Sequence, residues 1–86
     1  MTEAQNNFLT ELKIIQEQAV IMNSGQSNLS ENEKLFNVSY DTLYLVMELL
    51  GGYRGINISL LDNDHQEFLN DRIQLHDKIA NFLQSY

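Results

Sequence analysis

The first half of the chain contains two apolar patterns with helical spacing, each bounded by residues that start or stop helices. In the first pattern, apolar residues recur every three or four positions, which places them on one stripe of a helix. The stripe consists of Ala4, Phe8, Leu12, Ile15, Ala19 and Met22. Ser24 and Gly25 then interrupt the pattern, and glycine is a common residue at a left-handed helix end. We therefore predict a first helix over residues 2–23.

A second helix is predicted over residues 30–50, directly after the polar loop of residues 24–29. Ser30 and Glu33 have the spacing of a capping box, in which each side chain accepts a hydrogen bond from the backbone N–H of the other residue. Gly51 follows the last apolar residue, at a position where a glycine with positive φ would end the helix.

A third helix is predicted over residues 62–85, because polar and apolar residues separate onto two sides at helical spacing. Asp62 or Asp64 would cap its first turn, and Asn70 would lie on its solvent side. Residues 56–60 alternate between apolar and polar, which is the period of an extended segment. We interpret them as a linker that covers one end of the core. A short strand is the alternative, although so few residues make no stable sheet alone.

The second helix has more apolar surface than a chain of this size is expected to cover. Four polar side chains cluster within about 60° of its circumference, and a largely apolar sector of roughly 260° is interrupted only by Ser39, Thr42 and Glu33. The four clustered residues are Lys34, Asn37, Asp41 and Glu48. Contiguous exposed apolar patches mark interaction sites. We therefore expect the helix to meet a protein partner or a second copy, with Tyr44, Leu45 and Leu49 among the contacts. The alternative is that the linker and both chain ends cover the excess within one monomer.

These patterns predict one domain over residues 1–86, an all-α, small three-helix bundle that associates through its second helix, as a homodimer or with another protein. The chain contains no proline, which suits uninterrupted helices, and no cysteine, which excludes a disulfide framework and a thiolate metal site. Its first residues lack the basic and apolar regions of a signal peptide. The longest apolar run, residues 43–47, is far shorter than the roughly 20 residues that span a bilayer. We therefore expect a cytoplasmic protein without membrane contact.

The formal net charge of −7 disfavours direct binding to nucleic acid, which needs a basic face. An acidic protein can instead occupy a nucleic-acid-binding cleft by mimicry. Glu67, Asp71 and Asp77, on one side of the predicted third helix, would then stand for phosphates. Ten asparagines also hint at an AT-rich genome, such as that of a phage or a mobile element, where small inhibitors are plausible.

The stretch GGYRG, residues 51–55, resembles a phosphate-binding loop only in its glycine content. Phosphate loops follow a strand and open a helix, whereas these glycines follow a helix. The simplest interpretation is a helix stop followed by a turn. The alternative is an exposed contact loop, because Tyr53 and Arg54 are residue types that dominate binding energy at interfaces.

His65, Arg72 and His76 lie along one strip of the predicted third helix, within its apolar side. A guanidinium keeps its charge, so a buried Arg72 needs a carboxylate or several carbonyls as partners. The strip therefore predicts either a structural ion pair or a site for a small anionic ligand, to which Arg54 would also contribute.

Neither a metal site nor a catalytic motif is supported by the sequence. DNDHQE places Asp62 and Asp64 at the first two ligand positions of a calcium loop, but Glu67 and Ile73 replace its essential glycine and glutamate. No nucleophile elbow or zinc-binding H-E-x-x-H is present. We expect no metal, no cofactor and no enzymatic activity, with an acid–base pair of a histidine and a carboxylate as the alternative.

The leading functional hypothesis is a small acidic helical module, acting as a regulator, adaptor or inhibitor, that binds a protein through an apolar helix surface. The alternatives are an acidic mimic that inhibits a nucleic-acid-binding protein, and a small anionic-ligand-binding protein that uses Arg54, Arg72 and His76.

Overall fold

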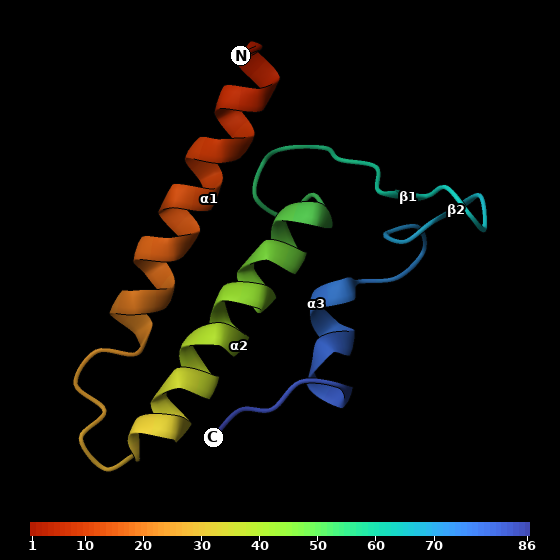
Figure 1. The fold of residues 1–86 in the computed structure, drawn as a ribbon. Helices are drawn as coiled ribbons and strands as arrows, with labels where there is room; N and C mark the ends of the chain where they lie inside the picture. The colour runs from red at the N-terminus through yellow and green to blue at the C-terminus, as the bar shows by residue number, and fades with distance from the viewer.

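Two long helices lie side by side and antiparallel in the computed structural model, which describes residues 1–86 (Figure 1). Helix α1 spans Glu3–Met22 and helix α2 spans Glu31–Leu50, and the two pack against each other. A short helix α3, Leu75–Lys78, contacts α2 on its other side, so that α2 lies between the other two helices (Figure 1). The chain is therefore mostly helical with three helices, as the sequence predicts.

Both long helices begin with a capping box. At α2, the backbone N–H of Glu33 donates to Ser30 Oγ at 3.2 Å and the backbone N–H of Ser30 donates to Glu33 Oε1 at 3.0 Å, which confirms the predicted start. At α1, Thr2 and Gln5 exchange the same two bonds, at 3.1 and 2.9 Å. These reciprocal bonds satisfy backbone donors that no helical carbonyl can reach.

The left-handed residue after α2 is Gly52, with φ of 84°, and not Gly51 as predicted. Gly51 has φ of −86° and its N–H still donates to the carbonyl of Met47 at 3.0 Å, so it continues the helical bonding for one residue. The left-handed step comes next, and it lets the N–H of Tyr53 donate to the carbonyl of Glu48 at 3.0 Å. The helix stop lies in the predicted stretch, one residue later.

The predicted helix over residues 62–85 is wrong. Strand β1, Leu61–Asp62, pairs antiparallel with strand β2, Glu67–Phe68, and forms a minor two-stranded sheet. The only helical turns that follow are α3 and a 3₁₀ turn, η1, at Ile79–Asn81. The hairpin projects away from α2 (Figure 1). Arg72, with φ of 63°, has a left-handed backbone that no continuous helix allows.

Hydrogen bonds of the Asp62 and Asn70 side chains explain why this segment is not helical. The Asp62 carboxylate accepts from the backbone N–H groups of Asp64 and His65, at 2.9 and 3.2 Å, and so stabilises a turn in place of a helix. The Asn70 amino group donates to the carbonyls of Leu50 and Ile58, both at 2.6 Å. Asn70 is therefore a half-buried connection between the end of α2 and the linker, and not a solvent-facing helix residue.

The core is small and lies between α1 and α2. Ile15, Leu45 and Leu49 form its centre, with exposed fractions of 1%, 8% and 0%. Ile56 and Ile58 of the linker pack against this cluster, which confirms that residues 56–60 cover one end of the core without forming a strand. Only 6 of the 86 residues are buried, so most apolar side chains of the chain stay partly in contact with water.

The molecule is more extended than its length requires. Its radius of gyration is 14.7 Å, whereas a compact domain of this length has about 12 Å. No helix combines the length and the apolar content needed to cross a membrane.

Candidate docking surface

Helix α2 presents one apolar side that the rest of the chain leaves uncovered. Leu35, Phe36 and Leu43 have exposed fractions of 64%, 37% and 42%, and Ser39 between them is also exposed. A rotation of about 100° per residue places these four side chains within roughly a third of the helix circumference. We call Leu35, Phe36, Ser39 and Leu43 the open face of α2.

Charged residues beyond the first turn of α2 lie on the side opposite the open face. Lys34, Asp41 and Glu48 are about half a turn away from Ser39 by the same rotation. The carboxylate of Asp41 also accepts from the side-chain amide of Asn23 at 2.8 Å, which connects α2 to the end of α1. The open face is therefore apolar and carries no charge of its own.

The surface at the start of the open face is hollowed into a depression of about 310 Å³, lined by Asn32, Leu35, Phe36 and Ser39. The Ser39 hydroxyl donates to the backbone carbonyl of Phe36 at 2.9 Å. This hydroxyl is already hydrogen-bonded within the helix, so covering it leaves no unpaired donor.

Asn37, on the charged side of α2, holds the backbone of Tyr86. The buried Asn37 side chain donates to the Tyr86 carbonyl at 3.2 Å and accepts from the Tyr86 N–H at 2.6 Å. The rings of Phe36 and Tyr86 lie 5.9 Å apart. Tyr86 remains 53% exposed, so it borders the open face without covering it.

The partner-binding residues predicted from the sequence are placed differently from one another. Leu45 and Leu49 are buried in the core of the monomer and offer no surface to a partner. Arg54 pairs with α1: its Nε lies 3.1 Å from Glu11 Oε2, and its Nη2 donates to Gln18 Oε1 at 2.9 Å. Arg54 therefore attaches the loop after α2 to α1.

Tyr44 and Tyr53 come together at His76. The His76 ring packs edge-on against both tyrosine rings, with centroids 5.5 Å from Tyr44 and 4.8 Å from Tyr53. His76 is buried, and its Nδ1 has no hydrogen-bond partner within the chain. Burial raises the pKa of Tyr44 above its usual value, and the negative charges of Glu48 and Asp77 add to this increase. The cluster joins α3 to α2 and to the loop that follows α2.

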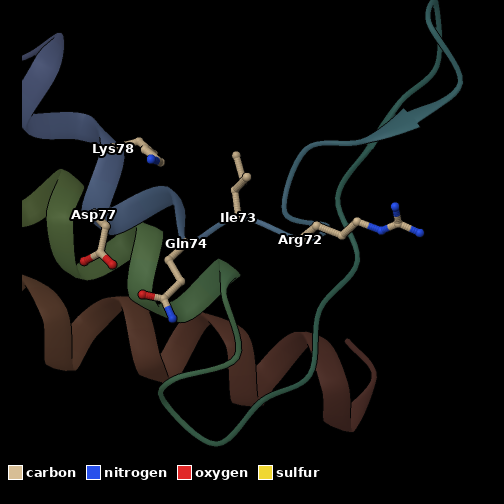
Figure 2. A pocket seen from close by; sticks show the side chains of 5 residues that line it. All are labelled: Arg72, Ile73, Gln74, Asp77 and Lys78. Carbon is tan, nitrogen blue, oxygen red and sulfur yellow. The ribbon is translucent and has the colours of Figure 1, made fainter.

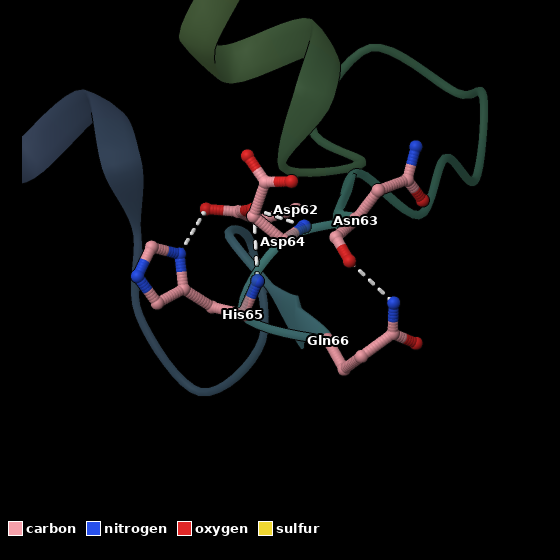
Figure 3. Close-up of polar contacts among 5 residues, drawn as sticks. All are labelled: Asp62, Asn63, Asp64, His65 and Gln66. Atoms are coloured by element: carbon pink, nitrogen blue, oxygen red, sulfur yellow. Dashed lines mark hydrogen bonds and ion pairs between the residues drawn. The ribbon is translucent and has the colours of Figure 1, made fainter.

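His65 lies in the hairpin turn, where its ring Nδ1 is 3.0 Å from Asp62 Oδ2 (Figure 3). This contact, together with the backbone bonds, holds the pKa of the Asp62 carboxyl below its usual value. The Asp62 oxygens are thus bound to groups of the turn itself. No three His, Asp or Glu side chains come together as metal ligands.

Arg72 lines an open depression of about 570 Å³ together with Ile73, Gln74, Asp77 and Lys78 (Figure 2). Its side chain is 92% exposed and points away from the other four, and its Nε lies 3.8 Å from Asp71 Oδ2. Because Arg54 is bound to α1 and His76 is buried, neither reaches this depression. The three residues of the proposed anion site are not brought together.

The acidic row predicted for nucleic-acid mimicry is also not formed. Glu67 lies on β2, Asp71 lies in the bend after it, and Asp77 lies on α3. Three separate segments replace the single helix that would have aligned these carboxylates.

Comparisons of the chain with protein-family models, with curated proteins and with solved structures return no match. Function is therefore inferred from the surface of the chain itself. The exposed members of the apolar sector of α2 are Leu35, Phe36 and Leu43. They were not singled out from the sequence. The available signal was their position on the side of the helix opposite the charged residues Lys34, Asp41 and Glu48.

Proposed function

We propose that the chain is a small acidic protein-interaction module that binds a protein partner through the open face of α2. The observation that carries the proposal is an exposed apolar helix side without charge, formed by Leu35, Phe36, Ser39 and Leu43. Exposed apolar surface of this kind is costly in water and is typical of docking sites.

The total exposed surface supports this proposal. The accessible surface of the chain is 6342 Å², whereas a folded monomer of 10.0 kDa has about 5,200 Å². The excess of about 1,100 Å² is spread over the whole extended chain, and the exposed side of α2 is one part of it.

The chain offers a matched pair of variants to test the proposal. Leu43→Glu places a charge in the open face, whereas Ile21→Glu makes the same kind of change on α1, where Ile21 is already 72% exposed. Burying an unpaired carboxylate is strongly unfavourable, so we expect Leu43→Glu to weaken partner binding at least tenfold and Ile21→Glu to leave it within about twofold.

The measurement is isothermal titration calorimetry with a purified partner, first identified by affinity capture from extracts of the cells that encode the chain. Far-ultraviolet circular dichroism of each variant shows whether its helices are intact. Equal partner affinities for wild-type protein and a folded Leu43→Glu variant would refute docking at the open face of α2 and leave the proposed function without its basis.

A further inference from the structure

Building on the proposed function, we infer that the partner docks with an amphipathic helix that carries lysine or arginine residues on both sides of its apolar stripe. The apolar stripe covers the open face of α2, and the basic residues pair with Glu31 and Glu33 in the first turn of α2. The partner is thus a protein segment of defined shape and charge.

The open face is a side of α2 that no helix of the chain covers. By a rotation of about 100° per residue, Leu45, Tyr44 and Ser39 point to three sides of α2 that lie roughly 100–140° apart. The Leu45 side packs against α1, and the Tyr44 side meets α3 at the ring of His76. The Ser39 side is uncovered over about two helical turns, or about 12 Å. A partner helix suits this side, because α2 already packs against a helix on each of the other two.

Two carboxylates flank the start of the open face. Asn32 lines the depression there, and Glu31 and Glu33 are its neighbours in the sequence. The same rotation therefore places these carboxylates about 100° to either side of Asn32. A helix that lies over Asn32 and Leu35 has one carboxylate along each edge of its contact surface. Lysine and arginine have apolar stems that can pack on the open face while their charged groups reach such an edge.

Neither carboxylate has a cation as its partner within the chain. Glu31 is exposed and forms no ion pair, even with Lys34 three residues later. Glu33 accepts from the backbone N–H of Ser30 at 3.0 Å through one of its two oxygens, and it also forms no ion pair. The first turn of α2 therefore offers two carboxylates to cations of a partner.

The charge of the whole chain favours the same kind of partner. A net charge of −7 attracts a basic segment, and it repels both an anionic membrane surface and a second copy of the chain. Leu35, Phe36, Ser39 and Leu43 carry no charge, so none opposes the burial of an apolar stripe on them. The apolar contact thus supplies affinity, whereas the acidic flanks select the sign of the partner's charge and increase the rate of association.

Two synthetic helical peptides of about 18 residues, roughly 27 Å long, test this selectivity. Both carry the same stripe of leucines, and the positions beside the stripe are lysine in one peptide and glutamate in the other. Fluorescence anisotropy of each labelled peptide, titrated with the protein, measures its affinity. We expect the lysine peptide to bind at least tenfold more tightly at low salt, and the difference to shrink as added salt screens the charges.

Variants of the protein separate the flanking carboxylates from the overall charge. The double variant Glu31→Gln, Glu33→Gln keeps the helix cap, because Gln5 makes the same capping bond at the start of α1. The control Glu17→Gln, Glu67→Gln removes the same total charge at two exposed sites outside α2. We expect the first double variant to bind the lysine peptide about fivefold more weakly than wild type, and the control to stay within about twofold.

Several results would overturn the basic partner helix. These are equal affinities of the two peptides, equal effects of the two double variants, and no binding of the lysine peptide up to millimolar protein. A wild-type dimer in sedimentation equilibrium that Leu43→Glu abolishes would also overturn it, because the open face would then belong to a second copy.

The proposed function is tested separately, because it requires only that Leu43→Glu weakens the binding of a purified partner. If Leu43→Glu does so while the peptides and the double variants show no selectivity for charge, the proposed function stands and the basic partner helix fails. If Leu43→Glu changes the binding of neither the purified partner nor the lysine peptide, both conclusions fail.

Discussion

Replacing Asn70 with alanine removes the side chain that connects the end of α2, the linker and the hairpin. Its amino group donates to the carbonyls of Leu50 and Ile58 at 2.6 Å, and its oxygen accepts from the N–H of Leu60 at 3.1 Å. Each bond contributes about 0.5–1.5 kcal/mol net, so the loss of three bonds should lower the free energy of unfolding by about 2–3 kcal/mol.

This loss is large for so small a core. A domain of this length has a free energy of unfolding of about 4–13 kcal/mol, and each kcal/mol moves its melting temperature by about 4–8 °C. Asn70→Ala should therefore melt roughly 10 °C or more below the wild-type protein. The Leu60 N–H, which also loses its acceptor, should exchange faster with solvent in native-state hydrogen exchange.

Urea unfolding followed by circular dichroism measures the change in the free energy of unfolding, and Asn63→Ala is the matched control. Asn63 lies in the same hairpin, is exposed, and its side chain makes no hydrogen bond. Asn70→Asp retains the acceptor for Leu60 but loses the amino group, so it should be at least as unstable as Asn70→Ala. A free energy of unfolding for Asn70→Ala within about 0.5 kcal/mol of wild type would show that the three Asn70 bonds do not stabilise the fold.

Two further predictions concern charged groups. Arg54→Ala removes the contacts with α1, including the ion pair to Glu11, and should lower the free energy of unfolding by about 1 kcal/mol. Urea unfolding measures this change. The control Arg72→Ala, at an exposed site, should change the free energy of unfolding little. The pKa of the Asp62 carboxyl is lower in the folded state than in the unfolded state. The ionised carboxylate therefore stabilises the fold above the unfolded pKa of about 3.9, and this stabilisation is lost as the pH falls through the lower folded pKa. The fall in the urea midpoint over this acidic range should therefore be smaller in Asp62→Asn, and an unchanged pH dependence in that variant would contradict the contact with His65.

The two long helices were predictable because their signals are local. Each has an apolar stripe at helical spacing, and the Ser30–Glu33 box marks where α2 begins. The box at Thr2 and Gln5 follows the same rule and was readable in the sequence too. Local signals failed for residues 62–74, because the pattern of apolar residues there also suits a helix. Asn70, in contrast, binds the carbonyls of Leu50 and Ile58, which only the folded chain brings near.

The docking surface could be predicted only in outline, for a related reason. The apolar sector of α2 showed that something must cover the helix, but not which part its own chain would cover. Leu45 and Leu49 face α1 and are buried, whereas Leu35 and Leu43 in the same sector are exposed. Separating these two pairs requires the positions of α1, the linker and the residues after α3, which depend on contacts between residues far apart in the sequence.

The open face and the missing third helix have one physical cause. A helix over residues 62–85 would be about 36 Å long, enough to run along the whole of α2, which measures about 30 Å. The four residues of α3 span only about 6 Å, and the residues before them form a hairpin that projects away from α2 (Figure 1). Ile56 and Ile58 of the linker reach the core at the later half of α2, and Tyr86 contacts α2 at Asn37 and Phe36. No segment of the chain is left to cover Leu35 and Leu43, so the side-chain bonds that replace the third helix also leave this side of α2 exposed.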